Sequence, residues 1–374
     1  MAAILYFPFY LVSLCFYKSK KICLFGAWQG NKYSDNAKAV FEAMSISRDI
    51  KCYWIYKNKE QFLEQRNNPY FVYAYSFKGI LLQLVSSSFV YSSGYDDFIT
   101  CLITVRAKKI NLWHGIPLKK IGYSDSINQP QGVKKSLRDF RNIVLPFTSN
   151  IPDYVLSNNE YFDQIMREAF KPKLGVITSG LPRNDVLKHR SSSCFSGRFS
   201  IIYCPTFRDK SDTLQYFDSN SLEKIQSFCE KINAEFKIKL HPADSHVLPN
   251  LSSYHLISDI TEQKGDLYSD ILNDADVLVT DYSSVMFDFA LTEKPVVLYP
   301  FDLQDYMSRS RELYFDYEND FSELICMSWS EVLEKIESDL HSTNIYKIND
   351  KFDHCGKLGS FSEKVADEIR KVIS

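Results

Sequence analysis

Short apolar runs alternate with amphipathic segments along most of the 374 residues of this chain. Ten apolar runs of three to six residues predict β-strands, and the spacing of apolar side chains over 36–45 and 221–233 predicts helices. Strands that alternate with helices predict an α/β fold, in which parallel sheets carry helices on both faces. Ten strands are too many for one small open sheet, so we expect two sheets in two domains. The predicted strands are 21–25, 51–56, 89–91, 109–113, 154–156, 175–178, 200–203, 235–240, 277–280 and 295–299.

Polar composition marks one boundary between domains. The serine-rich segment HRSSSCFSGRFS, around 188–197, separates two strand-like runs. A last helical pattern at 360–373 follows another polar stretch, and this helix can pack back on the first domain. The sequence therefore predicts four parts: an apolar segment at 1–20, an N-terminal domain at 21–190, a C-terminal domain at 198–355 and a C-terminal helix at 356–374.

The N-terminal segment is almost wholly apolar over 2–17 and is followed by Lys18, Lys20 and Lys21. About 16 helical residues span about 24 Å, which is less than the hydrocarbon core of roughly 30 Å. A signal peptide carries its positive charges before the apolar run, and here the order is reversed. We expect this segment to lie on the cytoplasmic leaflet of the membrane, with the lysines at the headgroups. The alternative is a buried first helix of the fold.

Charge and cysteine content limit the possible functions. The formal net charge is -2, from 44 basic and 46 acidic residues, which argues against a nucleic-acid-binding protein driven by overall basicity. The nine cysteines are scattered without a CxxC motif, so neither a zinc site nor a disulfide framework is expected. Free thiols suit a reducing compartment, which favours the cytosolic side.

Reactive side chains follow several predicted strands directly. His114 ends the run KKINLWHG, His241 ends FKIKLHP, and Arg208 comes shortly after the strand in IIYCPTFR. In doubly wound folds the ligand binds beyond the carboxyl ends of the strands, so we expect these residues to face one cleft. An imidazole titrates near neutral pH and can act as general base, and a guanidinium can bind phosphate oxygens. Each could instead be a structural histidine or a solvated arginine.

The run DVLVTDYSS has the same organisation. Asp281 ends a predicted strand, and Ser283 and Ser284 open the next helix. Hydroxyls and backbone N–H groups at a helix start attract an anion, so the pattern suits a phosphate-containing donor. An ordinary helix N-cap is the competing interpretation of the serine pair.

Two further motifs carry less weight. Asp274 and Asp276 form a DxD sequence, but they precede a strand, so we expect a solvated loop and no metal site. Gly26 and Gly30 follow a strand without the GxGxxG spacing of dinucleotide-binding proteins.

The motifs FGAWQGNKYSDNAK, NLWHGIPLKKIG, SGLPRND, YCPTFR, KLHP, DVLVTDYSSVMFDFALTEKPVVLYPFD and RELYFDYE occur in this order over about 21–320. Together they resemble the CDP-glycerol glycerophosphotransferase family, which includes teichoic-acid primases and polymerases and related capsule polymerases. The resemblance implies a GT-B architecture, with an acceptor-binding and a CDP-donor-binding Rossmann-like domain and a cleft between them. It also implies transfer of glycerol phosphate from CDP-glycerol to an acceptor hydroxyl, release of CMP, and peripheral association with the cytoplasmic face of the membrane. No cofactor or metal is implied.

The resemblance also implies functions for individual residues. Two histidines correspond to the family's functional histidines, and five residues correspond to its donor-binding motifs. The catalytic candidates are His114 and His241; the donor-binding candidates are Arg208, Ser283, Ser284, Asp281 and Arg311.

The resemblance leaves several alternatives open. The motifs do not separate CDP-glycerol from CDP-ribitol, nor a primase from a polymerase. The acceptor can be lipid-linked, a polyol phosphate or a glycan. A GT-B glycosyltransferase that uses a nucleotide sugar, and an inactive membrane scaffold in polymer assembly, are the competing functions.

Overall fold

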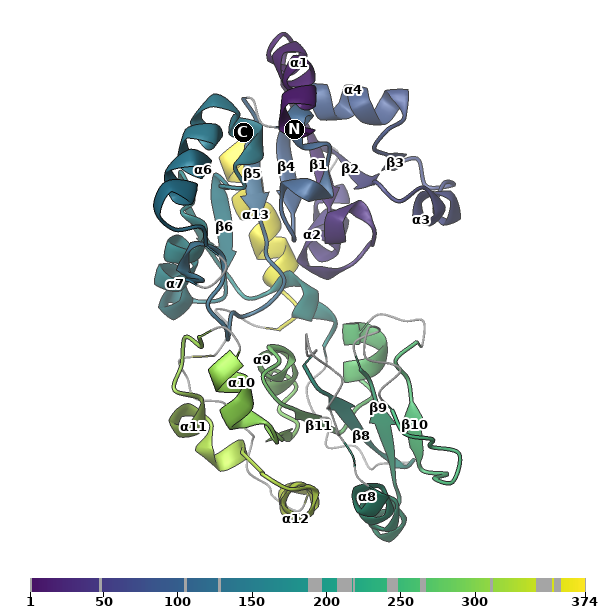
Figure 1. The fold of residues 1–374 in the computed structure, drawn as a ribbon. Helices are drawn as coiled ribbons and strands as arrows, with labels where there is room; N and C mark the ends of the chain where they lie inside the picture. The colour runs from purple at the N-terminus through teal and green to yellow at the C-terminus, as the bar shows by residue number, and fades with distance from the viewer. Residues whose placement is uncertain are drawn as a thin grey trace. The chain divides into compact units, whose positions relative to one another are not determined.

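The structure, a computed structural model, divides into two compact units (Figure 1). Unit 1 comprises Met1–His114, Ile121–Asp185 and His354–Ser374, and unit 2 comprises Gly115–Lys120 and Val186–Asp353. The residues that the structure describes are 2–46, 49–103, 106–126, 129–187, 197–206, 217, 219–240, 248–262, 267–309, 312–340, 352 and 358–373.

Unit 1 contains a seven-stranded parallel sheet with the order β3-β2-β1-β4-β5-β6-β7. The direction of winding reverses between β1 and β4, which is the switch point where ligands bind in doubly wound folds. The central strands are largely buried, as expected for a parallel sheet covered on both faces. The strands are β1 (Ser19–Gly26), β2 (Lys51–Tyr56), β3 (Phe71–Tyr73), β4 (Ser86–Tyr91), β5 (Lys108–Asn111), β6 (Tyr154–Ser157) and β7 (Gly175–Thr178).

Helices of unit 1 begin where the sequence supplies capping side chains. The Ser76 hydroxyl accepts the Gly79 N–H at 3.0 Å at the start of α4, and the Asn159 side chain accepts the Phe162 N–H at 3.1 Å at the start of α7. The helices are α1 (Ala2–Leu14), α2 (Asp35–Ser45), α3 (Lys59–Glu64), α4 (Phe77–Val85), α5 (Thr100–Ile103), α6 (Gly132–Val144), α7 (Glu160–Phe170) and α13 (Phe361–Ile373), with short helical turns η1 (Trp28–Gly30), η2 (Tyr95–Asp97), η3 (Gly122–Ser124), η4 (Pro146–Thr148) and η5 (Pro182–Val186).

Unit 2 contains a five-stranded parallel sheet with the order β10-β9-β8-β11-β12, which reverses between β8 and β11. One face packs against α8 and α12 around the buried Trp329 ring. The strands are β8 (Phe199–Cys204), β9 (Ala234–Ile238), β10 (Ile257–Asp259), β11 (Val277–Thr280) and β12 (Val296–Leu298). The helices are α8 (Ser219–Ile232), η8 (Leu267–Leu272), α9 (Val285–Ala290), α10 (Leu303–Arg309), α11 (Tyr317–Asp320), η9 (Ser322–Leu324) and α12 (Trp329–Leu340).

The predicted α/β fold with two parallel sheets is confirmed, and each of the ten predicted strands overlaps an observed one. The prediction missed β3 and β10, which have three residues each and lie at sheet edges, where the apolar signal is short. The prediction also placed the ends of β5 and β9 two residues too far along the chain. β5 ends at Asn111 and β9 at Ile238, so His114 and His241 each lie three residues beyond a strand end.

The N-terminal segment forms α1, which presents one face to the fold and another to solvent. Phe7, Tyr10 and Phe16 pack against the cluster that contains Phe147, and Tyr10 meets the Phe147 ring at a centroid distance of 5.3 Å. The expectation that Lys18 lies at lipid headgroups is wrong, because its side chain is buried and lies 3.5 Å from the Gln83 carbonyl. In the part of the chain that the structure describes, no helix has the length and hydropathy needed to cross a membrane.

The C-terminal helix α13 packs beside α2 in unit 1 (Figure 1, yellow). Asp185 caps its start by accepting the backbone N–H groups of Phe361 and Ser362 at 2.9 and 2.7 Å. The Phe361 ring is fully buried against Gly180, where an added Cβ would lie 2.1 Å from a ring carbon. Only glycine fits at Gly180, so the SGLPRND segment is shaped to receive the C-terminal helix.

Candidate active site

His114 is placed by a short turn after β5. The Leu112 N–H still donates to the Tyr91 carbonyl at 2.7 Å, and the chain then turns at Trp113, whose φ is 52°. The Trp113 N–H donates to the Asn111 side chain at 2.9 Å, which holds this left-handed turn. Gly115 follows with a φ of 148°, which glycine adopts readily, so the chain can turn away from the sheet directly after His114. His114 therefore lies at the carboxyl edge of the sheet, where the sequence predicted a ligand-binding residue.

The protonation state of His114 follows from its contacts. Its Nδ1 lies 3.2 Å from the carbonyl oxygen of Ser92, which can only accept, so Nδ1 carries the hydrogen and Nε2 the lone pair. Burial lowers the pKa of His114, and the Arg183 guanidinium lowers it further, while Asp35 and the Ser92 carbonyl act in the opposite direction. The imidazole is therefore neutral at neutral pH and can accept a proton at Nε2.

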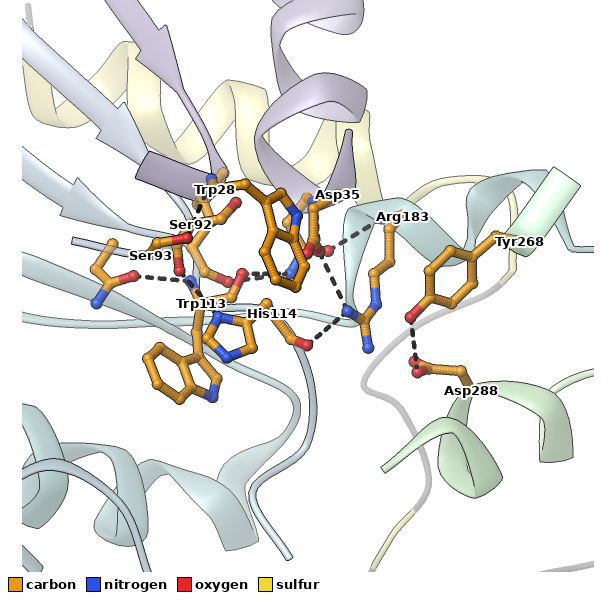
Figure 2. Close-up of polar contacts among 12 residues, drawn as sticks. Trp28, Asp35, Ser92, Ser93, Trp113, His114, Arg183, Tyr268 and Asp288 are labelled. Carbon is orange, nitrogen blue, oxygen red and sulfur yellow. Dashed lines mark hydrogen bonds and ion pairs between the residues drawn. The ribbon is translucent and has the colours of Figure 1, made fainter. Parts of the chain in front are cut away.

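A buried ion pair supports the backbone of His114. Arg183 Nη1 donates to the His114 carbonyl at 2.6 Å and to Asp35 Oδ1 at 3.2 Å, and both side chains are almost completely buried (Figure 2). The Asn36 side chain donates to the carbonyls of Leu112 and Trp113 at 3.1 and 3.0 Å. The beginning of α2 and the SGLPRND segment thus fix the peptide bonds on either side of the histidine.

Two indoles flank the imidazole. The ring centroid of Trp113 lies 3.9 Å from that of His114, and the Trp28 centroid lies 5.9 Å away; Figure 2 shows His114 between them. The Trp113 ring also packs on the Phe170 ring, with the two centroids 4.8 Å apart. In contrast, 45% of Trp28 is exposed to solvent. The two indoles pack beside the imidazole and contribute to the burial that lowers its pKa.

Asp97 holds together the two loops next to His114. Its carboxylate is buried and accepts the N–H of Gln29 at 2.6 Å, of Ser92 at 3.2 Å and of Ser93 at 3.1 Å. Burial nevertheless raises the pKa of Asp97 to about 6 against the opposing effect of these hydrogen bonds. The same loops supply the Ser92 carbonyl to His114 and the Ser93 hydroxyl to the Trp28 N–H at 3.1 Å, so Asp97 is a positioning residue.

Backbone strain is concentrated at this edge of unit 1. Trp28, Gln29, Asp35 and Trp113 have φ between 50° and 69° although none is glycine. Each such residue costs about 1 to 2 kcal/mol, and strain of this kind persists where the surrounding structure fixes a functional geometry. The four residues all adjoin the His114 contacts described above.

In unit 2, Asp281 joins the two strands at the switch point of the smaller sheet. Its Oδ1 accepts the Thr206 N–H at 2.8 Å, the Thr206 hydroxyl at 2.6 Å and the Tyr282 N–H at 2.6 Å. Its carbonyl accepts the Tyr317 hydroxyl at 2.9 Å. Because Asp281 is fully buried, these contacts shape the loops after β8 and β11. Thr206 belongs to the motif that contains Arg208.

The serine pair follows directly. Ser284 occupies the N-cap position of α9 without a capping hydrogen bond from its side chain, and the Ser283 hydroxyl accepts the Val285 N–H at 3.4 Å, which is long. Both side chains are half-buried. The hydrogen bond expected of an N-cap serine is therefore absent at Ser284, and its hydroxyl is able to bind a ligand.

Three predicted site residues, His241, Arg208 and Arg311, lie outside the described residues. Among the residues that are described, no cluster of three or more metal-ligating side chains occurs. Asp276 of the DxD sequence instead accepts the Ser200 N–H at 2.9 Å and ties the beginning of β8 to the β11 side.

Residues 8–370 match the family described as CDP-Glycerol:Poly(glycerophosphate) glycerophosphotransferase. The chain belongs to this family. It is 26% identical over 362 residues to the teichoic acid glycerol-phosphate transferase of Staphylococcus aureus, with 88% of this chain and 86% of that protein aligned. It is also 26% identical over 381 residues to the teichoic acid ribitol-phosphate primase of Bacillus spizizenii, with 93% and 90% aligned. Sequence identity thus does not separate the two polyols.

Among solved structures, the wall teichoic acid polymerase TagF superposes with a TM-score of 0.72 at 24% identity, covering 95% of this chain and 89% of that one. The similarity confirms the predicted GT-B type of fold for this member of the glycerophosphotransferase family. Trp28, Asp35 and Arg183 lie in motifs that carry the family resemblance, but the sequence alone indicates no function for these three residues. Asp97 lies outside every motif, so only the structure could reveal it.

Proposed function

We propose that this chain transfers glycerol phosphate from CDP-glycerol to a hydroxyl of a polymer or lipid-linked acceptor and releases CMP. The observation that carries the proposal is the His114 imidazole, neutral by burial and fixed by the Ser92 carbonyl with its Nε2 lone pair available. Membership in the glycerophosphotransferase family supplies the reaction class.

The chemical step needs one base and a charge-stabilising donor site. The acceptor oxygen forms a bond to the phosphorus that bears glycerol, and the bond from that phosphorus to the CMP oxygen breaks. His114 Nε2 takes the hydroxyl proton, and CMP leaves with the electron pair. Positioning and electrostatic stabilisation carry most of the rate enhancement in phosphoryl transfer.

Unit 2 supplies the donor-binding residues in this proposal. Ser283 and Ser284 bind the diphosphate with their hydroxyls at the beginning of α9, and Arg208, His241 and Arg311 bind its charge. Asp281 acts by holding Thr206, and therefore the loop that carries Arg208, at the switch point.

Acceptor-dependent CMP release tests the function. The purified protein is given CDP-glycerol and CDP-ribitol in parallel, with and without a polyol-phosphate acceptor. We expect CMP from one donor only in the presence of acceptor, and its loss in His114→Ala with donor binding retained. His255→Ala, at an exposed histidine, is the matched control. CMP release at the wild-type rate by His114→Ala would contradict the assignment of the base, and release of UDP or GDP from a nucleotide sugar would replace the proposed reaction.

A membrane surface is the second proposed partner, at the cytoplasmic face. The outward side of α1 exposes Tyr6, Phe9 and Val12, each about half accessible to solvent. Phe7 and Tyr10 of the same helix pack against the cluster that contains Phe147. An apolar helix face at a protein surface can enter the headgroup region.

Helix α6, absent from the sequence predictions, adds a second such face. None of its residues is buried, and the stripe of Val133, Leu137, Phe140 and Val144 is 50% to 76% exposed. Its sequence GVKKSLRDFRNIV places four basic residues beside this stripe, as in helices that lie on anionic membranes. Helix α1 packs on α5, and both α5 and α6 contact the turn η4.

Vesicle sedimentation tests this partner. We expect binding to anionic vesicles, weakened by Phe140→Glu and by deletion of 2–17, and little binding to neutral ones. Met327→Glu, at an exposed apolar residue of unit 2, is the control. Equal sedimentation of the Phe140→Glu variant and the wild type would show that α6 does not contact lipid.

A further inference from the structure

The indole of Trp28 is held outward by a strained backbone. Trp28 and Gln29 both have left-handed φ values, of 50° and 58°, and their N–H groups are fixed by Ser93 and Asp97. The conformation leaves 45% of Trp28 exposed to solvent, so burial accounts for only part of the position of this indole. What the conformation provides is an apolar surface 5.9 Å from the proposed general base.

A cation lies over this surface. Lys32 Nζ is 5.6 Å from the centroid of the Trp28 ring, and its side chain is exposed. Within the described part of the chain Lys32 makes no salt bridge, so its charge is available to a ligand. An indole face beside an ammonium group suits a molecule with C–H groups next to an anion.

We propose that Trp28 and Lys32 form the subsite for the reacting end of the acceptor, and that this end is a polyol carrying a phosphate. The inference rests on the proposed function. The C–H face of the terminal polyol stacks on the indole, its hydroxyl points to His114 Nε2, and the preceding phosphodiester pairs with Lys32.

Two other ligands could use an exposed indole. The cytosine of the donor stacks on aromatic rings, and a neutral glycan acceptor would use Trp28 without Lys32. We favour the acceptor because Trp28 adjoins the base that takes the acceptor proton, and a phosphate because the ammonium lies over the same ring. The experiment separates the three.

Steady-state kinetics of the full chain, with CDP-glycerol and an alkyl-linked glycerol phosphate dimer as acceptor, test the subsite. We expect Trp28→Ala to raise the acceptor KM about tenfold and Trp28→Phe to restore most of it, because a ring face remains. Lys32→Ala should raise the acceptor KM about fivefold and remove most of its salt dependence, and Lys32→Arg should restore both. The donor KM should stay constant throughout. Lys78→Ala is the matched control, since Lys78 lies 5.1 Å from the Tyr53 ring.

The outcomes are distinct. A raised donor KM with unchanged acceptor KM would assign Trp28 to the cytosine and overturn the proposal. Full salt dependence in Lys32→Ala would exclude the phosphate contact and favour a neutral acceptor; this variant tests the idea even where Trp28→Ala does not fold. Calorimetry that measures binding of the glycerol phosphate dimer in the absence of donor tests the subsite independently of the reaction. Binding that depends on Lys32, together with no CMP release by the wild type, would support the subsite and refute the proposed function.

Discussion

Replacing Asp97 with asparagine should remove the pH dependence that this carboxylate gives to the stability of unit 1, and it should lower activity. The carboxylate is fully buried, and burial raises its pKa to about 6 from 3.8. An asparagine has the same shape and no charge, so it resembles the protonated carboxyl group. It cannot, however, accept hydrogen bonds on both sides from the Gln29, Ser92 and Ser93 N–H groups.

The magnitude follows from the pKa. A pKa shift of this size means that ionised Asp97 destabilises the folded state by about 3 kcal/mol at about pH 7. The contribution of the protonated Asp97 side chain to stability is fully present below the unfolded pKa of 3.8. This contribution is lost as the pH rises through about 6, the pKa in the folded state. Between about pH 7 and pH 4 the wild type should therefore gain roughly 2 kcal/mol relative to Asp97→Asn, which binds no proton at this site.

Urea unfolding at a series of pH values, followed by tryptophan fluorescence, measures this difference. Three of the four tryptophans, Trp28, Trp54 and Trp113, belong to unit 1, so the signal reports mainly on the unit that contains Asp97. Activity should fall about tenfold or more, because the Ser92 carbonyl and Trp28 lose their common support. Asp96→Asn, at the exposed neighbouring carboxylate, is the control. A stability difference between wild type and Asp97→Asn that does not change with pH would refute the reasoning.

Three further predictions concern the same unit. Arg183→Met leaves the Asp35 carboxylate buried without its partner and should destabilise the protein by about 3 to 5 kcal/mol in urea unfolding; a loss below about 1 kcal/mol would mean that water reaches the pair. Phe361→Ala removes the ring that packs on Gly180 and should cost about 3 to 5 kcal/mol, with α13 becoming sensitive to proteolysis; protection equal to the wild type would argue against this docking. Because burial lowers the pKa of His114, kcat/KM should decline only below the ordinary histidine value of 6.5, and a decline centred above it would exclude this imidazole as the base.

The motifs of the chain indicated part of the site but not its organisation. His114, Asp281, Ser283 and Ser284 were identified because each lies in a short segment that follows a strand. The network that fixes His114 could not be identified in this way. Arg183 and Asp35 are 148 residues apart, and Gln29 is 68 residues from Asp97, so neither pair leaves a local pattern.

The sequence by itself determined the α/β class, the ten major strands, the helices at α2, α8 and α13, and the family, because apolar periodicity and short motifs are local properties of the chain. The tertiary structure alone decided where strands end, which carbonyl orients His114, and that Trp28 and Trp113 take left-handed conformations beside it. It also decided that Lys18 is buried and that the apolar side of α6 faces solvent. These properties depend on which distant segments pack together, and packing energy, not local preference, selects among the conformations that each segment could adopt.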